Sequence, residues 1–291
     1  GHTISDLTIT GQYSPAGLFG IVEEQGSIES LSVRGVVSVS DSADTTTGGI
    51  VGINHGTLIS CQFTGVVTGD SEVGGIVGRN ESEGTIDHST ARAIVTGKSS
   101  TGGIAGYNLG AITGCTNVGA VNSEYQESAL DMEGLPATLL ELVKKDMGDD
   151  LSNNISNVSS DTGGIAGYST GIVQSCTNSG SVGYPHVGYN VGGVAGRQNG
   201  YMASCINHGT VQGRKDVGGI VGQMAPDITL QTSGASLDTL KDDLNSLQSL
   251  VDRMLDDAQA TSDTVSARMD RISAYADDAL DSAHSLSGRL G

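Results

Sequence analysis

Apolar and polar residues along the chain fall into short segments that recur at a nearly constant spacing. Each copy has two glycines, two small apolar residues and a third glycine, followed by two further apolar segments. The glycine pairs are Gly48-Gly49, Gly74-Gly75, Gly102-Gly103, Gly163-Gly164, Gly192-Gly193 and Gly218-Gly219. The steps between them are 26, 28, 61, 29 and 26 residues, and the segment Gly17–Gly20 adds a seventh copy without the leading glycine. The sequence is therefore a tandem repeat with one long insertion.

We call a set of equivalent positions, one from each copy of the repeat, a register. Three registers are apolar in nearly every copy. They hold Ile50, Ile76, Ile104, Ile165, Val194 and Ile220, then Leu58, Ile86, Ile112, Val173, Met202 and Ile228, and last Val67, Val95, Val121, Val182 and Val211. Apolar registers in short β-type segments predict coils that stack equivalent positions on one another. A helical repeat is disfavoured, because every copy carries five or six glycines and each costs about 1 kcal/mol in a helix relative to alanine. The pattern predicts an all-β parallel β-solenoid, or β-helix, of about seven coils.

Two segments lack the glycine rhythm and are expected to be helical. In the insert, residues 123–161, Pro136 begins an apolar stretch that predicts a short helix lying against the solenoid. The apolar residues of this stretch are Leu139, Leu140, Leu142 and Val143. Residues 234–291 carry apolar positions spaced alternately by 3 and 4, which predicts a long α-helix with heptads. We expect the solenoid to span residues 1–233 and the C-terminal segment to form a helical hairpin or a coiled coil, the latter giving a homo-oligomer.

The charge of the chain limits the classes of partner. There are 33 acidic and 14 basic residues, a formal net charge of −19, so nucleic acid and an anionic membrane surface would both repel the chain. Calcium and basic partners remain compatible with this charge. The sequence has no apolar run of the roughly 18 residues that a membrane-spanning helix needs, and its start has no signal-peptide pattern. We expect both ends to lie inside a longer protein.

The repeat resembles the GLUG motif. Two copies read GGIAGYNLGAITGCTNVGAV and GGIAGYSTGIVQSCTNSGSV, and the opening GHTISDLTITG is similar to segments that commonly precede such arrays. GLUG motifs occur in tandem in bacterial surface proteins, in large adhesins and in the non-catalytic regions of IgA1-cleaving metallopeptidases. The resemblance covers about residues 1–233 without the insert. It implies a repeat architecture at a bacterial cell surface or in a secreted protein, and no particular activity.

The cysteines share one register of the repeat, twelve residues after the second glycine of a pair. This register holds Cys61, Cys115, Cys176 and Cys205, with Leu31 and Ser89 in other copies. The Ser89 coil separates Cys61 from Cys115 by about 10 Å, which is too far for a disulfide. No paired cysteine spacing or interleaved histidine indicates zinc. We expect four reduced, buried thiols that act as small apolar side chains, with no metal site and no cofactor.

Two further registers are rich in asparagine. One holds Asn54, Asn80 and Asn108, and the other holds Asn117, Asn178 and Asn207. Stacked amides one strand apart can hydrogen-bond to each other and cap the turns of the backbone. We favour this structural ladder over calcium binding, because the calcium-binding nonapeptide repeat with its aspartate is absent.

The fourth residue after each glycine pair is chemically varied and is expected to face solvent. In this register Arg79 above Tyr107, and Tyr168 below Arg197, are spaced for cation–π contacts. We predict that Arg79, Tyr107, Tyr168 and Arg197 form a partner-contact stripe. The alternative is a surface ladder that only stabilises the stacking of coils.

Signatures of catalysis are missing from the sequence. There is no H-E-x-x-H zinc motif, and the phosphate-loop-like Gly97–Ser99 has Arg92 where the first glycine is required. We therefore predict a non-enzymatic, extracellular module of a bacterial cell surface that mediates binding or spacing, with a host or bacterial surface protein or glycan as its partner. Two alternatives stay open: a non-catalytic region of a secreted IgA1-type metallopeptidase, and a carbohydrate-active β-helix enzyme.

Overall fold

The computed structural model describes residues 1–39, 45–123 and 159–225 and, nearer the C-terminus, residues 259, 263, 266–271, 273, 274, 277 and 278. The chain divides into two compact units, Gly1–Ile228 and Thr229–Gly291. The helix predicted in the insert lies outside the described residues, and so does most of the predicted C-terminal helix.

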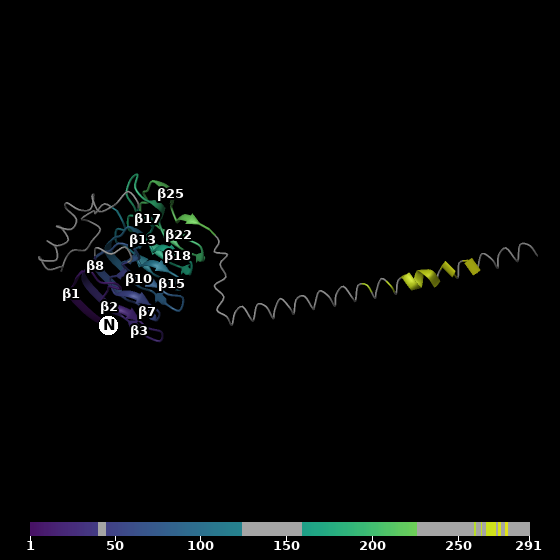
Figure 1. The fold of residues 1–291 in the computed structure, drawn as a ribbon, viewed down its shortest axis with the longest axis horizontal. Helices are drawn as coiled ribbons and strands as arrows, with labels where there is room; N and C mark the ends of the chain where they lie inside the picture. Colours follow the sequence, from purple (N-terminus) through teal and green to yellow (C-terminus); the bar gives the residue numbers. More distant parts are fainter. Residues whose placement is uncertain are drawn as a thin grey trace, which may run out of the picture. The chain divides into compact units, whose positions relative to one another are not determined.

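The first unit is a parallel β-solenoid with four sheets, which we call A, B, C and D in the order in which a complete coil visits them (Figure 1). Sheet A contains β1 (His2–Gly11), β4 (Leu31–Val39), β8 (Gln62–Thr68), β12 (Thr90–Thr96), β16 (Thr116–Asn117), β20 (Thr177–Asn178) and β24 (Ile206–Asn207). Sheet B contains β5 (Thr47–Gly48), β9 (Val73–Gly74), β13 (Ser99–Gly102), β17 (Ser160–Gly163), β21 (Tyr189–Gly192) and β25 (Lys215–Gly218). Sheet C contains β2 (Phe19–Val22), β6 (Val51–Asn54), β10 (Val77–Asn80), β14 (Ala105–Asn108), β18 (Ala166–Ser169), β22 (Ala195–Gln198) and β26 (Val221–Met224). Sheet D contains β3 (Ser27–Glu29), β7 (Thr57–Ile59), β11 (Thr85–Asp87), β15 (Ala111–Thr113), β19 (Ile172–Gln174) and β23 (Tyr201–Ala203). Neighbouring strands pair in parallel, as the repeat predicts.

The described chain makes about six turns, and the prediction of seven coils is wrong. Sheets A and C have seven strands each, but sheets B and D have six. The first copy has no strand in sheet B, where Ala16 makes only an isolated bridge to Thr47. In the last copy the register that would continue sheet D falls at Ile228, outside the described residues. Counting glycine segments therefore overestimates the turns, because the two terminal copies supply only part of a coil.

Stacking of the apolar registers builds the core. In the first register Ile50, Ile104 and Val194 are fully buried, whereas Ile220 of the last coil is 41% exposed. Each inner coil is covered by a coil above and a coil below, with equivalent residues opposite each other, as for Ile86 and Ile112. Burial of a register therefore ends only where a coil lacks a neighbour. Sequence spacing predicts these contacts because each one joins the same position of consecutive copies.

Asparagine ends the later strands of sheet A early. β16, β20 and β24 have two residues each, whereas β8 and β12 have seven. In a short strand the asparagine side chain accepts a hydrogen bond from the glycine two residues later, as Asn178 Oδ1 does from the N–H of Gly180 at 3.2 Å. This contact turns the chain at the strand end. The long strands carry Phe63 and Ala91 at the same register and continue straight.

The asparagines also bond along the solenoid axis. The Nδ2 of Asn117 donates to Asn178 Oδ1, and the Nδ2 of Asn178 donates to Asn207 Oδ1, each at 2.8 Å. In the second ladder Asn80 accepts from Asn54 and donates to Asn108, again at 2.8 Å. The predicted structural role of both asparagine registers is confirmed by these bonds.

The second unit contains helical residues, and only a short helical stretch of it is described. Residues 266–271 are helical and exposed, as are the isolated described positions around them. Met269, an apolar heptad position of the predicted helix, is 62% exposed. The few described residues of this unit support neither a long helix nor a second helix packed on it, so neither the hairpin nor the coiled coil is confirmed. An apolar position at heptad spacing is buried only when a partner helix is present.

Candidate functional site

The four residues of the predicted contact stripe lie side by side on the outer face of sheet C. Arg79, Tyr107, Tyr168 and Arg197 come from β10, β14, β18 and β22 and are in direct register. The Cζ atom of Arg79 lies 4.6 Å from the ring centroid of Tyr107, and that of Arg197 lies 5.2 Å from the centroid of Tyr168. The two rings meet edge to face, with centroids 4.9 Å apart. Both cation–π contacts expected from the spacing are therefore present, and the four side chains form one continuous ladder.

The stripe is half-buried, whereas the sequence predicted a solvent-facing register. Acidic residues flank both arginines and reduce their exposure. The Nε of Arg79 lies 2.6 Å from Glu81 Oε1, and its Nη1 pairs with Glu72. At the other end the Nε of Arg197 lies 3.2 Å from Asp161 Oδ1, an ion pair without hydrogen-bond geometry at the nitrogen. The guanidinium groups are thus neutralised locally.

Sequence reasoning missed the acidic residues beside the stripe. Glu72 and Asp161 occupy the register two residues before each glycine pair, which also holds Thr46, Ser100, Asn190 and Asp216, whereas Glu81 follows Arg79 by two residues. The repeat pattern of the sequence begins at the glycine pair, so positions before the pair lie outside its recognisable registers. Their fixed distance from the glycine pair is the signal that could have found them.

Burial changes the acid–base properties of this site. Desolvation raises the pKa of the Asp161 carboxyl group, although a hydrogen bond from Asn190 and the charge of Arg197 lower it. The Asn190 Nδ2 donates to Asp161 Oδ1 at 2.7 Å. Desolvation also raises the pKa of the Tyr107 hydroxyl group, with a further contribution from Tyr168. The tyrosine therefore stays neutral and can offer a hydrogen bond at any physiological pH.

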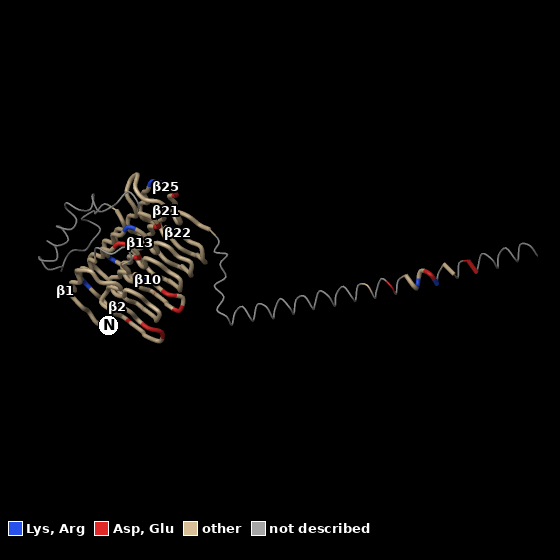
Figure 2. The backbone as a smooth tube through the Cα atoms, in the orientation of Figure 1, with Lys and Arg blue, Asp and Glu red and all other residues tan. Residues whose placement is uncertain are grey.

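Charge is otherwise sparse on the solenoid. Figure 2 shows Lys, Arg, Asp and Glu scattered along a backbone that is mostly uncharged. Among the described residues no group of three or more His, Cys, Asp and Glu side chains is arranged to hold a metal ion. No helix in that part of the chain is long and apolar enough to cross a membrane.

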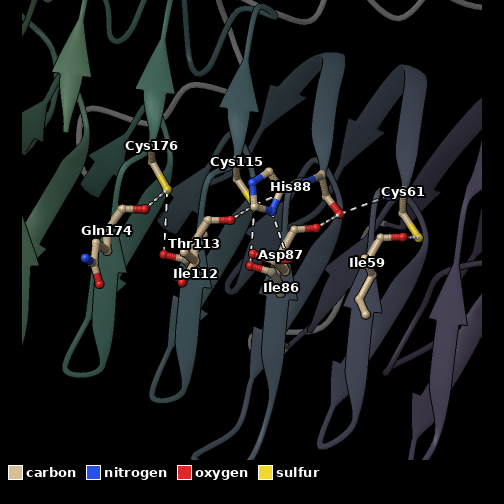
Figure 3. A network of polar contacts seen from close by, with 11 residues as sticks. Ile59, Cys61, Ile86, Asp87, His88, Ile112, Thr113, Cys115, Gln174 and Cys176 are labelled. Carbon is tan, nitrogen blue, oxygen red and sulfur yellow. Dashed lines mark hydrogen bonds and ion pairs between the residues drawn. The ribbon is translucent and has the colours of Figure 1, made fainter. Parts of the chain in front are cut away.

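The cysteines form the predicted single ladder between the strands of sheets D and A, and Figure 3 shows three of its members, Cys61, Cys115 and Cys176. All four are free thiols, and each Sγ contacts the backbone carbonyl two residues earlier, as Cys115 does with Thr113 at 3.4 Å. Ser89 takes the same place between Cys61 and Cys115, accepting from the N–H of Cys61 and donating to the carbonyl of Asp87. Serine thus replaces cysteine in one copy with equivalent hydrogen bonds, whereas the first copy has the buried, apolar Leu31 in this register.

One part of the cysteine prediction is wrong. Cys61, Cys115 and Cys176 are buried, but Cys205 is only half-buried. Cys205 belongs to the copy that begins at Gly192, and within residues 159–225 of the described chain no further coil covers its side chain.

We expect alkylation to distinguish Cys205 from the other thiols. With iodoacetamide at pH 8.5, the folded chain should gain one label slowly, at Cys205, and the denatured chain should gain four. The reaction at Cys205 should be slow because its hydrogen bond with Cys176 and its burial raise its pKa. Mass spectrometry of peptides gives the count, and two or fewer labels after denaturation would reveal a disulfide.

The thiol ladder also gives a pH dependence. Contact with the Cys115 thiol, and burial, raise the pKa of Cys176 from 9.0 to about 12, although contact with Cys205 opposes the shift. The folded state thus holds this proton more tightly than the unfolded chain. Its contribution to stability is complete below about pH 9 and is lost as the pH rises toward 12.

One repeat of the chain matches a known sequence motif. The family model described as the GLUG motif matches residues 69–96, which contain the glycine pair Gly74-Gly75 and strands β9 to β12. Residues 69–96 of the chain therefore contain a GLUG motif. The matched stretch is one repeat length, and strands of the following copies pair with it in the same parallel register along the solenoid.

Two other proteins are similar to this GLUG chain. Halomucin from Haloquadratum walsbyi is 36% identical over 92 residues, which is 31% of this chain and 1% of Halomucin. A crystal structure from Bacteroides ovatus, named as a candidate immunoglobulin A1 protease, is 18% identical, with a TM-score of 0.43 over 77% of this chain and 66% of that one. The GLUG chain thus spans a very small part of Halomucin and about two thirds of the Bacteroides chain.

Proposed function

We propose that this GLUG solenoid is a non-catalytic module of an extracellular bacterial protein, exposed at the cell surface or secreted, that binds a partner through the stripe Arg79, Tyr107, Tyr168 and Arg197. The observation that carries the proposal is the unbroken register of these side chains across four coils. Two aromatic rings between two guanidinium groups combine large contact area with hydrogen-bond donors, and Tyr and Arg are enriched among residues that dominate interfaces.

The partner class that fits is a surface protein or a glycan. The guanidinium groups are already paired with Glu72, Glu81 and Asp161, so a highly charged anion would have to displace these carboxylates. A neutral glycan or a mixed protein surface would instead contact ring edges, hydroxyl groups and the outer rims of the ion pairs. The Tyr168 hydroxyl group already accepts from Asn199 Nδ2 at 3.0 Å and retains its own proton for donation.

Binding of the labelled chain to a glycan panel and to intact bacterial and epithelial cells tests this function. If the stripe makes the contact, the double substitution Tyr107→Ser and Tyr168→Ser should weaken binding at least about 30-fold, as expected for central interface residues. Tyr201→Ser is the matched control, because Tyr201 is an exposed tyrosine outside the stripe. Equal binding by both variants, with a lower melting temperature only for the stripe variant, would assign the stripe to coil stacking. Release of shortened glycans by the unmodified chain would contradict the non-catalytic role.

A further inference from the structure

The contact stripe is a run of four rungs that is bounded at both ends. Each rung comes from one coil, and the rungs lie in direct register on the outer face of sheet C. In the same register Ile53 precedes Arg79, and Gln223 follows Arg197. Neighbouring strands of a sheet lie about 4.8 Å apart, so the stripe is about 14 Å long from Arg79 to Arg197. The stripe thus presents one planar side chain per coil along the solenoid axis.

Polar groups accompany the stripe along its length. Glu72 and Glu81 pair with Arg79 at one end. Asp161 pairs with Arg197 at the other end. The two tyrosines between these ends carry hydroxyl groups, which can donate and accept hydrogen bonds. Every rung therefore combines a flat side-chain surface with polar groups of both kinds, and a sugar ring with its hydroxyl groups can use both.

Two polar atoms beside Tyr168 lack a hydrogen-bond partner among the described residues. They are Arg197 Nε and Asn199 Oδ1, and both are buried. The Arg197 Cζ atom lies 5.2 Å from the centroid of the Tyr168 ring, and Asn199 Nδ2 donates to the Tyr168 hydroxyl group at 3.0 Å. A buried polar atom without a partner is costly. A ligand hydroxyl group that reaches either atom, after a small rotation of the side chain, therefore gains more than one that replaces an existing bond.

The spacing of the rungs distinguishes between classes of polymer. In an extended peptide, side chains on one face recur every two residues, or about 6.6 Å, which exceeds the rung spacing. A docked amphipathic helix needs an apolar groove, whereas no aliphatic residue lies within the stripe. A straight β-linked sugar chain, such as that of chitin, advances by nearly one rung spacing with each sugar. Successive sugars can therefore meet successive coils, which favours a straight glycan over a polypeptide.

We infer that the contact stripe binds a neutral, straight polysaccharide chain along the solenoid axis, with one sugar at each of its four coils. This inference rests on the proposed function, which leaves the partner open between a surface protein and a glycan. Both guanidinium groups are already paired with carboxylates, and the net charge of the chain is −19, so an acidic polysaccharide is repelled. Each sugar up to the fourth contacts a new coil, and a fifth sugar meets Ile53 or Gln223 instead.

A series of chito-oligosaccharides of one to six sugars tests the inference by isothermal titration calorimetry. The dissociation constant should fall about fivefold with each sugar from the first to the fourth, the gain expected of one further hydrogen bond. The fifth and sixth sugars should change it by less than about twofold. Malto-oligosaccharides of the same lengths are the comparison, because their α-linked chain coils and cannot follow a straight stripe. They should show no gain beyond the second sugar.

The substitution Ile53→Tyr should lengthen the stripe by one rung. Ile53 is half-buried and pairs with Arg79 in the register of the stripe. In this variant the affinity should rise up to the fifth sugar and level off there. Ile59→Tyr is the matched control, because Ile59 is also half-buried but lies on the outer face of sheet D. The control should still level off at the fourth sugar, and a stripe that only stabilises coil stacking would not respond to either change.

Other results would overturn the inference. Affinity that is independent of length, or that rises equally in both sugar series, would exclude a straight chain along the axis. An unchanged levelling point in folded Ile53→Tyr would show that the sugars do not follow the register, and the length series in the unmodified chain decides if that variant fails to fold. Absence of sugar binding, with cell binding that is lost in the Tyr107→Ser and Tyr168→Ser variant, would assign the stripe to a protein partner and leave the proposed function standing. Absence of both sugar and cell binding would contradict the inference and the proposed function together.

Discussion

Replacing Gly164 by alanine should destabilise the solenoid by about 3 kcal/mol or more, the upper range for overpacking a filled interior. A Cβ atom at Gly164 would lie 2.2 Å from the carbonyl oxygen of Gly193 in the next coil and 2.3 Å from Asn178 Cγ. Both contacts are far inside van der Waals distance, and neither the backbone nor the buried amide can move freely. Urea denaturation followed by circular dichroism gives the loss in unfolding free energy.

The same substitution at Gly219 is the matched control. Gly219 is the second glycine of its pair, as Gly164 is, but no atom lies within 4 Å of a Cβ placed there. We expect Gly219→Ala to change the unfolding free energy by less than about 0.5 kcal/mol. A large effect at Gly219, or a small one at Gly164, would show that the glycine pair serves a purpose other than close approach of neighbouring coils.

The second large effect is expected for Asn178→Leu. The buried Asn178 side chain makes four hydrogen bonds, donating to Asn207 Oδ1 and the carbonyl of Gly180 and accepting from Asn117 Nδ2 and the N–H of Gly180. Leucine has a similar volume but bonds to none of them. Each buried polar group left without a partner costs about 1–3 kcal/mol, so the total loss should reach about 3 kcal/mol.

Asn207→Leu at the open end of the ladder supplies the comparison for Asn178→Leu. Asn207 is half-buried, so water can replace part of its bonding, and its loss should destabilise the chain by about half as much. Thermal melts of the two variants, measured at the same pH, provide the ratio. Equal losses of stability at the two positions would contradict this expectation. They would mean that the turn each asparagine makes at its strand end contributes more to stability than the hydrogen bonds along the solenoid axis.

In the candidate site, residue spacing predicts which side chains become neighbours, and contacts with other parts of the coil decide how far those side chains are buried. The register of Arg79 and Tyr107 follows from counting residues after the glycine pair, because equivalent positions of a stacked repeat become neighbours. The partial burial of Arg79 does not follow, because it depends on Glu72, which lies directly before β9 in a different part of the coil. Likewise the four cysteines share a register that counting finds, while the partial exposure of Cys205 depends on its place at the end of the described coils.

Local, periodic information in the sequence determined the parallel coil, the three apolar registers and the asparagine ladders of this protein. Each of these features joins the same position in consecutive copies, so a fixed step along the chain becomes a fixed contact in space. Only the tertiary structure decided where the turns end and which carboxylates neutralise Arg79 and Arg197. These features depend on the ends of the repeat and on contacts between different registers, so the period of a single register does not predict them.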